Sequence, residues 1–105
     1  MEGYLVTFFT QQNREYEGVS LARWIVDEAR KLGGRGATLT SAKEGFGHDG
    51  RFHSGDYFDL EDAPLQVTMA LTSEEFKRLI SVLEQNRIRI FYTRSKIEFG
   101  FTSEE

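Results

Sequence analysis

The segment "PLQVTMALT" (residues 64–72) predicts a β-strand that buries one of its faces. Large apolar residues alternate with small or polar ones at the two-residue period of a strand. One face carries Leu65, Val67, Met69 and Leu71, and the other carries Gln66, Thr68, Ala70 and Thr72. We expect the first face to meet helices in the core and the second to point away from them.

A helix is predicted directly after this strand. In "TSEE" (residues 72–75), Thr72 caps the helix and Glu75 reaches back to the cap, which is the pattern of a capping box. Apolar residues then recur at helical spacing, at Phe76, Leu79, Ile80 and Leu83. The helix is expected to end near Asn86.

The first third of the chain also predicts a strand and a helix. "GYLVTFFT" (residues 3–10) is apolar on both faces, as in a central strand, and the polar residues 11–18 are expected to form a loop. A helix follows over residues 21–32, and the glycines of "GGRG" (residues 33–36) end it. Its apolar stripe consists of Leu21, Trp24, Ile25, Ala29 and Leu32.

The remaining strands complete a known arrangement. "ATLTSAKEGFG" (residues 37–47) is expected to form the second strand, extended structure resumes over residues 50–60, and residues 87–101 form the last strand. With right-handed crossovers, this βαββαβ order predicts a ferredoxin-like α+β sandwich: a four-stranded antiparallel sheet with two helices on one face. The length of 105 residues fits a single domain, residues 1–105.

The uncovered face of this sheet predicts self-association. The first and last strands carry apolar residues on both faces, so Phe8 or Phe9, and Phe91 or Tyr92, must point away from the helices. An apolar sheet face that no helix covers is usually buried against another subunit. We therefore expect a homo-oligomer.

Composition excludes several classes of protein. The net charge of −4 disfavours non-specific binding to nucleic acid or to anionic membranes. No apolar run approaches the roughly 20 residues that cross a bilayer, so we expect no membrane insertion. The chain has no cysteine and no signal-peptide pattern at its start, which fits a cytoplasmic protein.

An RNA-recognition motif is a second possible use of this fold. It would need a basic and aromatic signature on the third strand, and "LQVTMALT" (residues 65–72) contains neither kind of residue. "RIRIFYTR" (residues 87–94) combines arginines with aromatic residues, but a strand with one solvated face explains this pattern more simply. We therefore expect no nucleic-acid partner.

The segment "GRGATLTSAKEGFGHDGRFHSGDY" (residues 34–57) resembles the nitrogen-regulatory PII proteins. It is most similar to PII-like proteins catalogued as a domain of unknown function, in which a short segment replaces the long T-loop. The order of "YEG", "GATL", "EGFG" and "AP" extends this resemblance over about residues 3–99. It implies a homotrimer that binds adenine nucleotides between subunits and contacts protein targets through the loop at residues 45–56.

The resemblance also implies a set of ligand-binding residues. Gly36 and Thr38 match the start of the strand that approaches the base, and the T-loop corner is matched by Gly45, Phe46 and Gly47. Missing Cβ atoms at such a corner let backbone N–H groups approach an anion, although a tight hairpin needs glycine as well. Lys43 and Arg51 could add positive charge, or could simply be exposed surface cations.

One part of the family pattern is missing. In PII proteins a glycine-rich loop after the second helix holds the phosphates, and "LEQNRIRIF" (residues 83–91) has no glycine. Full ATP binding is therefore not expected, and a smaller or different ligand is left as an alternative.

A metal site is the third hypothesis for the same loop. His48, Asp49, His53 and Asp56 are the residues with metal-ligand chemistry, but their spacing matches no recognised site. Solvated loop residues are the simpler interpretation. No set of base, nucleophile and orienting group is evident, so we expect neither catalysis nor a cofactor.

The sequence as a whole favours a PII-like regulatory protein without enzymatic activity. Two alternatives stay open: an oligomeric interaction module that binds no ligand, and a divalent-metal-binding protein that uses His48 and His53.

Overall fold

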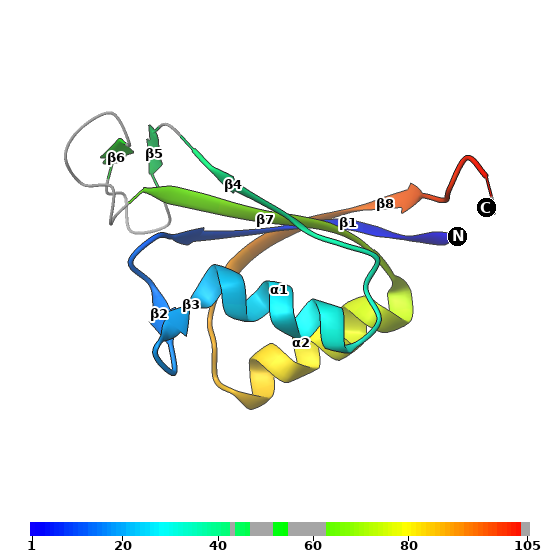
Figure 1. Ribbon diagram of the computed structural model, residues 1–105, viewed down its shortest axis with the longest axis horizontal. Helices are drawn as coiled ribbons and strands as arrows, with labels where there is room; N and C mark the ends of the chain where they lie inside the picture. The colour runs from blue at the N-terminus through cyan, green and yellow to red at the C-terminus, as the bar shows by residue number, and fades with distance from the viewer. Residues whose placement is uncertain (43, 47–51, 55–62, 104–105) are drawn as a thin grey trace.

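The computed structural model describes residues 1–42, 44–46, 52–54 and 63–103. Four strands form the main sheet, in the order β4 (Thr38–Ser41), β7 (Pro64–Thr72), β1 (Glu2–Gln11) and β8 (Phe91–Glu98). Every neighbouring pair is antiparallel. The strand order and the two helices on one side of the sheet (Figure 1) confirm the ferredoxin-like fold.

Helix α1 (Leu21–Lys31) begins at Ser20, whose hydroxyl accepts a hydrogen bond from the N–H of Arg23. Gly33 follows the helix with a φ of 96°, a left-handed conformation that glycine adopts without strain. Its N–H donates to the carbonyl of Arg30, and the Gly34 N–H donates to that of Ala29. These bonds confirm the predicted stop at the glycine cluster.

Helix α2 (Ser73–Gln85) confirms the capping box. The Thr72 hydroxyl accepts from the N–H of Glu75 at 3.1 Å, and a Glu75 carboxylate oxygen accepts from the N–H of Thr72 at 2.9 Å. Asn86 ends the helix, as expected. Glu75 also pairs with Arg35, which ties the start of α2 to the segment before β4.

The core lies between the sheet and the helices. The face of β7 predicted to be buried is buried, and the helices contribute Leu21, Ile25, Phe76, Leu79 and Leu83. Trp24 packs at the margin of this core and is partly exposed, so its predicted core position is only partly right. Its ring meets that of Tyr16 edge-on, with centroids 5.0 Å apart.

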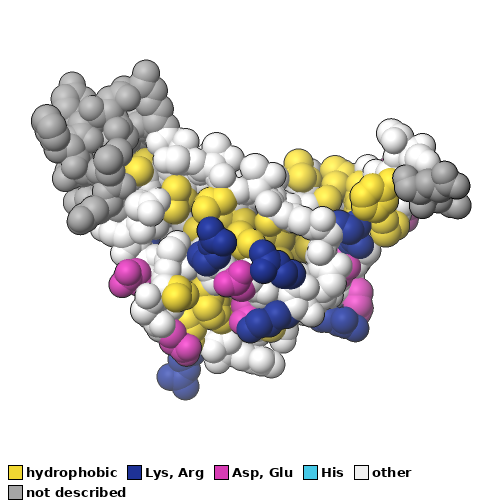
Figure 2. All heavy atoms as spheres, viewed as in Figure 1, with side chains coloured by type: hydrophobic (Ala, Val, Ile, Leu, Met, Phe, Trp, Pro, Cys, Tyr) yellow, Lys and Arg dark blue, Asp and Glu magenta, His cyan; other side chains and the backbone are white. Residues whose placement is uncertain are grey.

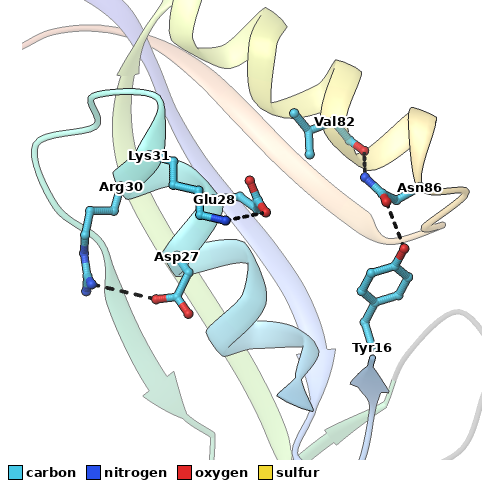
Figure 3. Close-up of polar contacts among 7 residues, drawn as sticks. All are labelled: Tyr16, Asp27, Glu28, Arg30, Lys31, Val82 and Asn86. Carbon is cyan, nitrogen blue, oxygen red and sulfur yellow. Dashed lines mark hydrogen bonds and ion pairs between the residues drawn. The ribbon is translucent and has the colours of Figure 1, made fainter. Parts of the chain in front are cut away.

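The polar segment before α1 is not an irregular loop. It forms a small hairpin from β2 (Glu15–Tyr16) and β3 (Val19–Ser20). Glu17 and Gly18 both have positive φ, 51° and 82°, as a tight type I′ turn requires. The Tyr16 hydroxyl donates to the Asn86 side-chain oxygen at 2.9 Å, which joins the hairpin to the end of α2 (Figure 3).

Two other predicted strands have different bounds. The second strand divides into β4 and β5 (Glu44–Phe46), and β5 pairs with β6 (Phe52–Ser54) in a separate hairpin. The last strand begins at Phe91, not at Arg87, because Phe91 is the first residue that pairs with β1. Ile88 and Ile90 before it pack against the core instead.

The open face of the sheet is more polar than predicted. Phe9 and Phe91 are the aromatic residues that point away from the helices, whereas Phe8 is fully buried and Tyr92 contacts the ring of Phe76. Next to the pair of Phe9 and Phe91 lies a row of threonines, one on each strand. Its members are Thr38, Thr68, Thr7 and Thr93.

Candidate functional site

The candidate site begins on β4, which is one edge of the sheet. Gly36 precedes the strand with a φ of 148°, and a side chain added there would meet open space. Thr38 is the first residue of the strand and is exposed. It lies opposite Thr68 on the open face, at one end of the threonine row.

The other end of β4 leads into the β5–β6 hairpin. Gly45 pairs with His53 and Phe46 with Phe52. The hairpin lies on the side of the sheet opposite the helices (Figure 1), so it projects in the direction of the open face. Six candidate residues, Lys43, Gly47, His48, Asp49, Arg51 and Asp56, lie outside the described residues.

The two halves of the predicted ligand site are separated along β4. The backbone N–H of Ala42 still bonds to the carbonyl of Pro64, so the chain follows β7 from Thr38 to Ala42. Four steps of an extended strand span about 13 Å. A small ligand beside Gly36 and Thr38 on a single copy would therefore not reach Ala42, from which the chain continues to β5.

The open face carries hydroxyl groups that pair across strands. The Oγ1 atoms of Thr7 and Thr68 are 3.3 Å apart, a hydrogen bond between the two central strands. Phe9 and Phe91 lie next to this row, toward the hairpin end, with ring centroids 5.6 Å apart. Phe91 is 59% exposed. Phe9 is half-buried. A partly polar face with one exposed and one half-buried aromatic ring suits contact with another protein surface.

Arg14 is a feature that the sequence did not reveal. Its guanidinium donates to the backbone carbonyl of Arg89, which is 75 residues away. Partial burial removes water from this group and lowers its pKa from the ordinary value. The bond fixes the segment before β8 beside the end of β1, and no local pattern in a polar segment could have predicted it.

Charge on the helix-covered side is mixed. Figure 2 shows lysine and arginine side chains interspersed with acidic ones over the helices. Two of the contacts are i,i+3 pairs on α1, Arg30 with Asp27 at 3.9 Å and Lys31 with Glu28 at 3.4 Å (Figure 3). Such a surface lacks the uniform cationic field that nucleic-acid binding requires.

The described residues offer no preformed metal site. No group of three or more histidine, aspartate or glutamate side chains among them is arranged to hold an ion. None of the helices in this part of the chain is long and apolar enough to cross a membrane.

Comparisons with known proteins agree with this geometry. The family model DUF190, described as "Uncharacterized ACR", matches residues 3–99. A PII-like signalling protein from Thermus thermophilus aligns with a TM-score of 0.66 and 19% identity, over 91% of this chain and 87% of that one.

A nitrogen regulatory PII-like protein from Thiomonas intermedia, solved with ADP, AMP and bicarbonate, aligns with a TM-score of 0.71 and 15% identity. The match covers 96% of this chain and 91% of that one. The apo form of that protein aligns with a TM-score of 0.54 and 13% identity, over 92% of each chain. By sequence this chain belongs to the DUF190 family, and its fold is the one shared by these PII-like proteins.

Proposed function

We propose that this chain is a cytoplasmic PII-like regulatory protein without catalytic activity. It assembles as a homotrimer, binds a small metabolite such as an adenine nucleotide between subunits, and signals occupancy to a protein target through the loop at residues 45–56. The observation that carries the proposal is the path of β4, which leads from Gly36 and Thr38 into the β5–β6 hairpin on the open side of the sheet.

The separation of the two half-sites supports binding between copies. Gly36 and Thr38 lie at one end of β4, and Ala42, which leads toward Gly45 in β5, lies about 13 Å from Thr38. A neighbouring copy packed on the open face can bring its own surface to either end. The solved relative that holds ADP, AMP and bicarbonate has the same fold, which supports a nucleotide or a small anion as the ligand.

A ligand-free interaction module is the competing function. The segment that replaces the glycine-rich phosphate loop, residues 83–91, ends α2 and continues through Ile88 and Ile90, which pack against the core. The N–H groups of Asn86, Arg87 and Ile88 donate to carbonyls of α2, so these three are not free to hold a phosphate. A ligand with fewer phosphates than ATP therefore fits the proposal better.

Titration calorimetry with ADP, AMP and bicarbonate tests the proposal, each with and without a divalent metal ion. We expect saturable binding of a nucleotide or of bicarbonate, with one site per chain. A response to the metal alone would favour the metal-binding alternative that uses His48 and His53. If none of these probes produces a heat of binding, the proposed metabolite binding is contradicted, and the ligand-free interaction module becomes the better account.

Two matched pairs of variants locate the site. Thr38→Val removes a hydroxyl at the candidate site, and Thr40→Val removes one from the same exposed strand two residues further on. We expect weaker binding for the first and wild-type binding for the second. Gly47→Val should abolish binding while Gly100→Val, in open space, should not. Equal effects within each pair would contradict the assignment.

A further inference from the structure

β8 is an edge strand of the main sheet. The strand pairs with β1 on one side only, in an unbroken register from Phe91 to Glu98. It contains no proline, and all of its residues except Ile97 are exposed. In the described part of the chain, no backbone group pairs with this outer edge. A row of free N–H and C=O groups is a template for another strand.

The opposite edge of the sheet is different. β4 has only four residues, and the chain leaves it toward the β5–β6 hairpin. β8 has eight. A strand of about this length is what an extended peptide needs to bind through main-chain hydrogen bonds. If an extended partner adds to the sheet, β8 is therefore the edge that accepts it.

The middle of β8 is positively charged and already ordered. Arg94 and Lys96 share its helix-side face with Tyr92. The Arg94 guanidinium lies over two rings, 4.6 Å from the centroid of Tyr4 and 4.9 Å from that of Phe76. Neither Arg94 nor Lys96 forms an ion pair within the described residues. A cation held in place without a counter-ion attracts a carboxylate at little entropic cost.

A hollow lies beside this basic row. It has a volume of about 430 Å³, and Tyr4, Ser73, Lys96 and Ile97 form part of its wall. Glu2 and Glu98, which face each other across β1 and β8, line the hollow as well. The favourable position for an acid is therefore next to Arg94 and Lys96, and not at the end of the strand.

The charge disfavours pairing of β8 with β8 of a second copy. Suppose that β8 of a second copy paired antiparallel with this strand, centred between Arg94 and Lys96. Arg94 of each copy would then face Lys96 of the other, and like charges directly across strands repel. We propose that the β8 edge binds an extended acidic segment of a partner protein by strand addition, with carboxylates beside Arg94 and Lys96. This surface is distinct from the proposed ligand site at Gly36 and Thr38, which lies at the β4 edge on the other side of the sheet.

Fluorescence anisotropy with a labelled octapeptide of alternating valine and glutamate tests the charge preference. We expect binding that weakens as salt increases, and at least about tenfold weaker binding of the same peptide with lysine in place of glutamate. Lys96→Glu should weaken the glutamate peptide by about tenfold. Arg23→Glu, an equal charge change on the exposed side of α1, should not. Equal binding of both peptides, or equal loss in both variants, overturns the proposal.

Hydrogen exchange distinguishes strand addition from simple charge attraction. On binding the glutamate peptide, the outward amides of residues 91–98 should exchange at least about tenfold more slowly. A peptide with N-methyl groups on alternate residues along one edge should lose binding, whereas methylation along its other edge should not. Unchanged exchange in β8, or insensitivity to both methylation patterns, would exclude strand addition.

Discussion

The two faces of the sheet are made by the same strands and carry different residues. On the covered face Val6, Phe8, Val67 and Leu71 are fully buried beneath the helices. On the open face the threonine row lies beside Phe91, which remains 59% exposed. The covered face has already buried its apolar surface and holds the fold, whereas the open face still exposes apolar surface, which is where we expect association between copies.

Neighbouring residues of β1 give the largest expected difference between these faces. Phe8→Ala should lower the free energy of unfolding by about 3–5 kcal/mol, because it leaves a cavity in the core. Phe9→Ala removes the same atoms from the open face. At low protein concentration, where copies are not associated, it should lower the free energy of unfolding far less. Urea unfolding monitored by circular dichroism compares them. Equal losses at low protein concentration would contradict the division between the faces.

The open face should show its role in self-association. Phe91→Ala removes an exposed aromatic side chain that contacts Phe9, so we expect at least about tenfold weaker association between copies. Sedimentation velocity over a range of concentrations measures it. Val19→Ala is a control, because Val19 is also exposed but lies in the β2–β3 hairpin. An unchanged association constant for Phe91→Ala would place the interface elsewhere.

Two threonines of β1 sharpen the comparison further. Thr10 is 8% exposed on the covered face, and its hydroxyl has no hydrogen-bond partner among the described residues. Thr10→Val should therefore raise the free energy of unfolding by about 1 kcal/mol. Thr7→Val removes a hydroxyl that bonds to Thr68 and should lower it slightly, by about 0.5 kcal/mol. Thermal unfolding of both variants checks the opposite signs.

The smallest expected effect concerns the bond between Tyr16 and Asn86. Partial burial, followed by the charge of Glu17, raises the pKa of Tyr16 above its ordinary value of 10.0. The neutral tyrosine therefore favours the folded state, fully below pH 10 and less as the pH rises through the raised pKa. Tyr16→Phe should lower the free energy of unfolding slightly at pH 7, because the bond to Asn86 is lost. Measured from pH 7 to pH 11, the difference in free energy of unfolding between the wild type and Tyr16→Phe should shrink above pH 10. A difference that stays constant would contradict the raised pKa of Tyr16.

Local patterns in the sequence predicted part of this fold accurately. The bounds of β7 match residues 64–72, because strict alternation and a capping box are signals carried by the segment itself. The start of β8 could not be found in this way. Ile88 and Ile90 continue the strand pattern, but pairing begins only at Phe91, opposite Phe9.

The candidate site was less accessible to sequence reasoning. Alternation showed that one of two adjacent aromatic residues must face away from the helices, but only the register with β8 identifies Phe9. The bond from Arg14 to Arg89 joins residues 75 apart, and two polar segments carry no sign of it. The length of chain that follows β7, from Thr38 to Ala42, likewise depends on pairing between distant segments.

Native mass spectrometry of the protein freshly purified from cells tests the central proposal most directly, because it reports the assembly and any retained ligand in one spectrum. The proposed function predicts a species of three times the 12.1 kDa chain, with added mass that matches a nucleotide or another small metabolite. A stable species of one chain at micromolar concentration, with no added mass, would contradict both the homotrimer and the ligand site between its subunits.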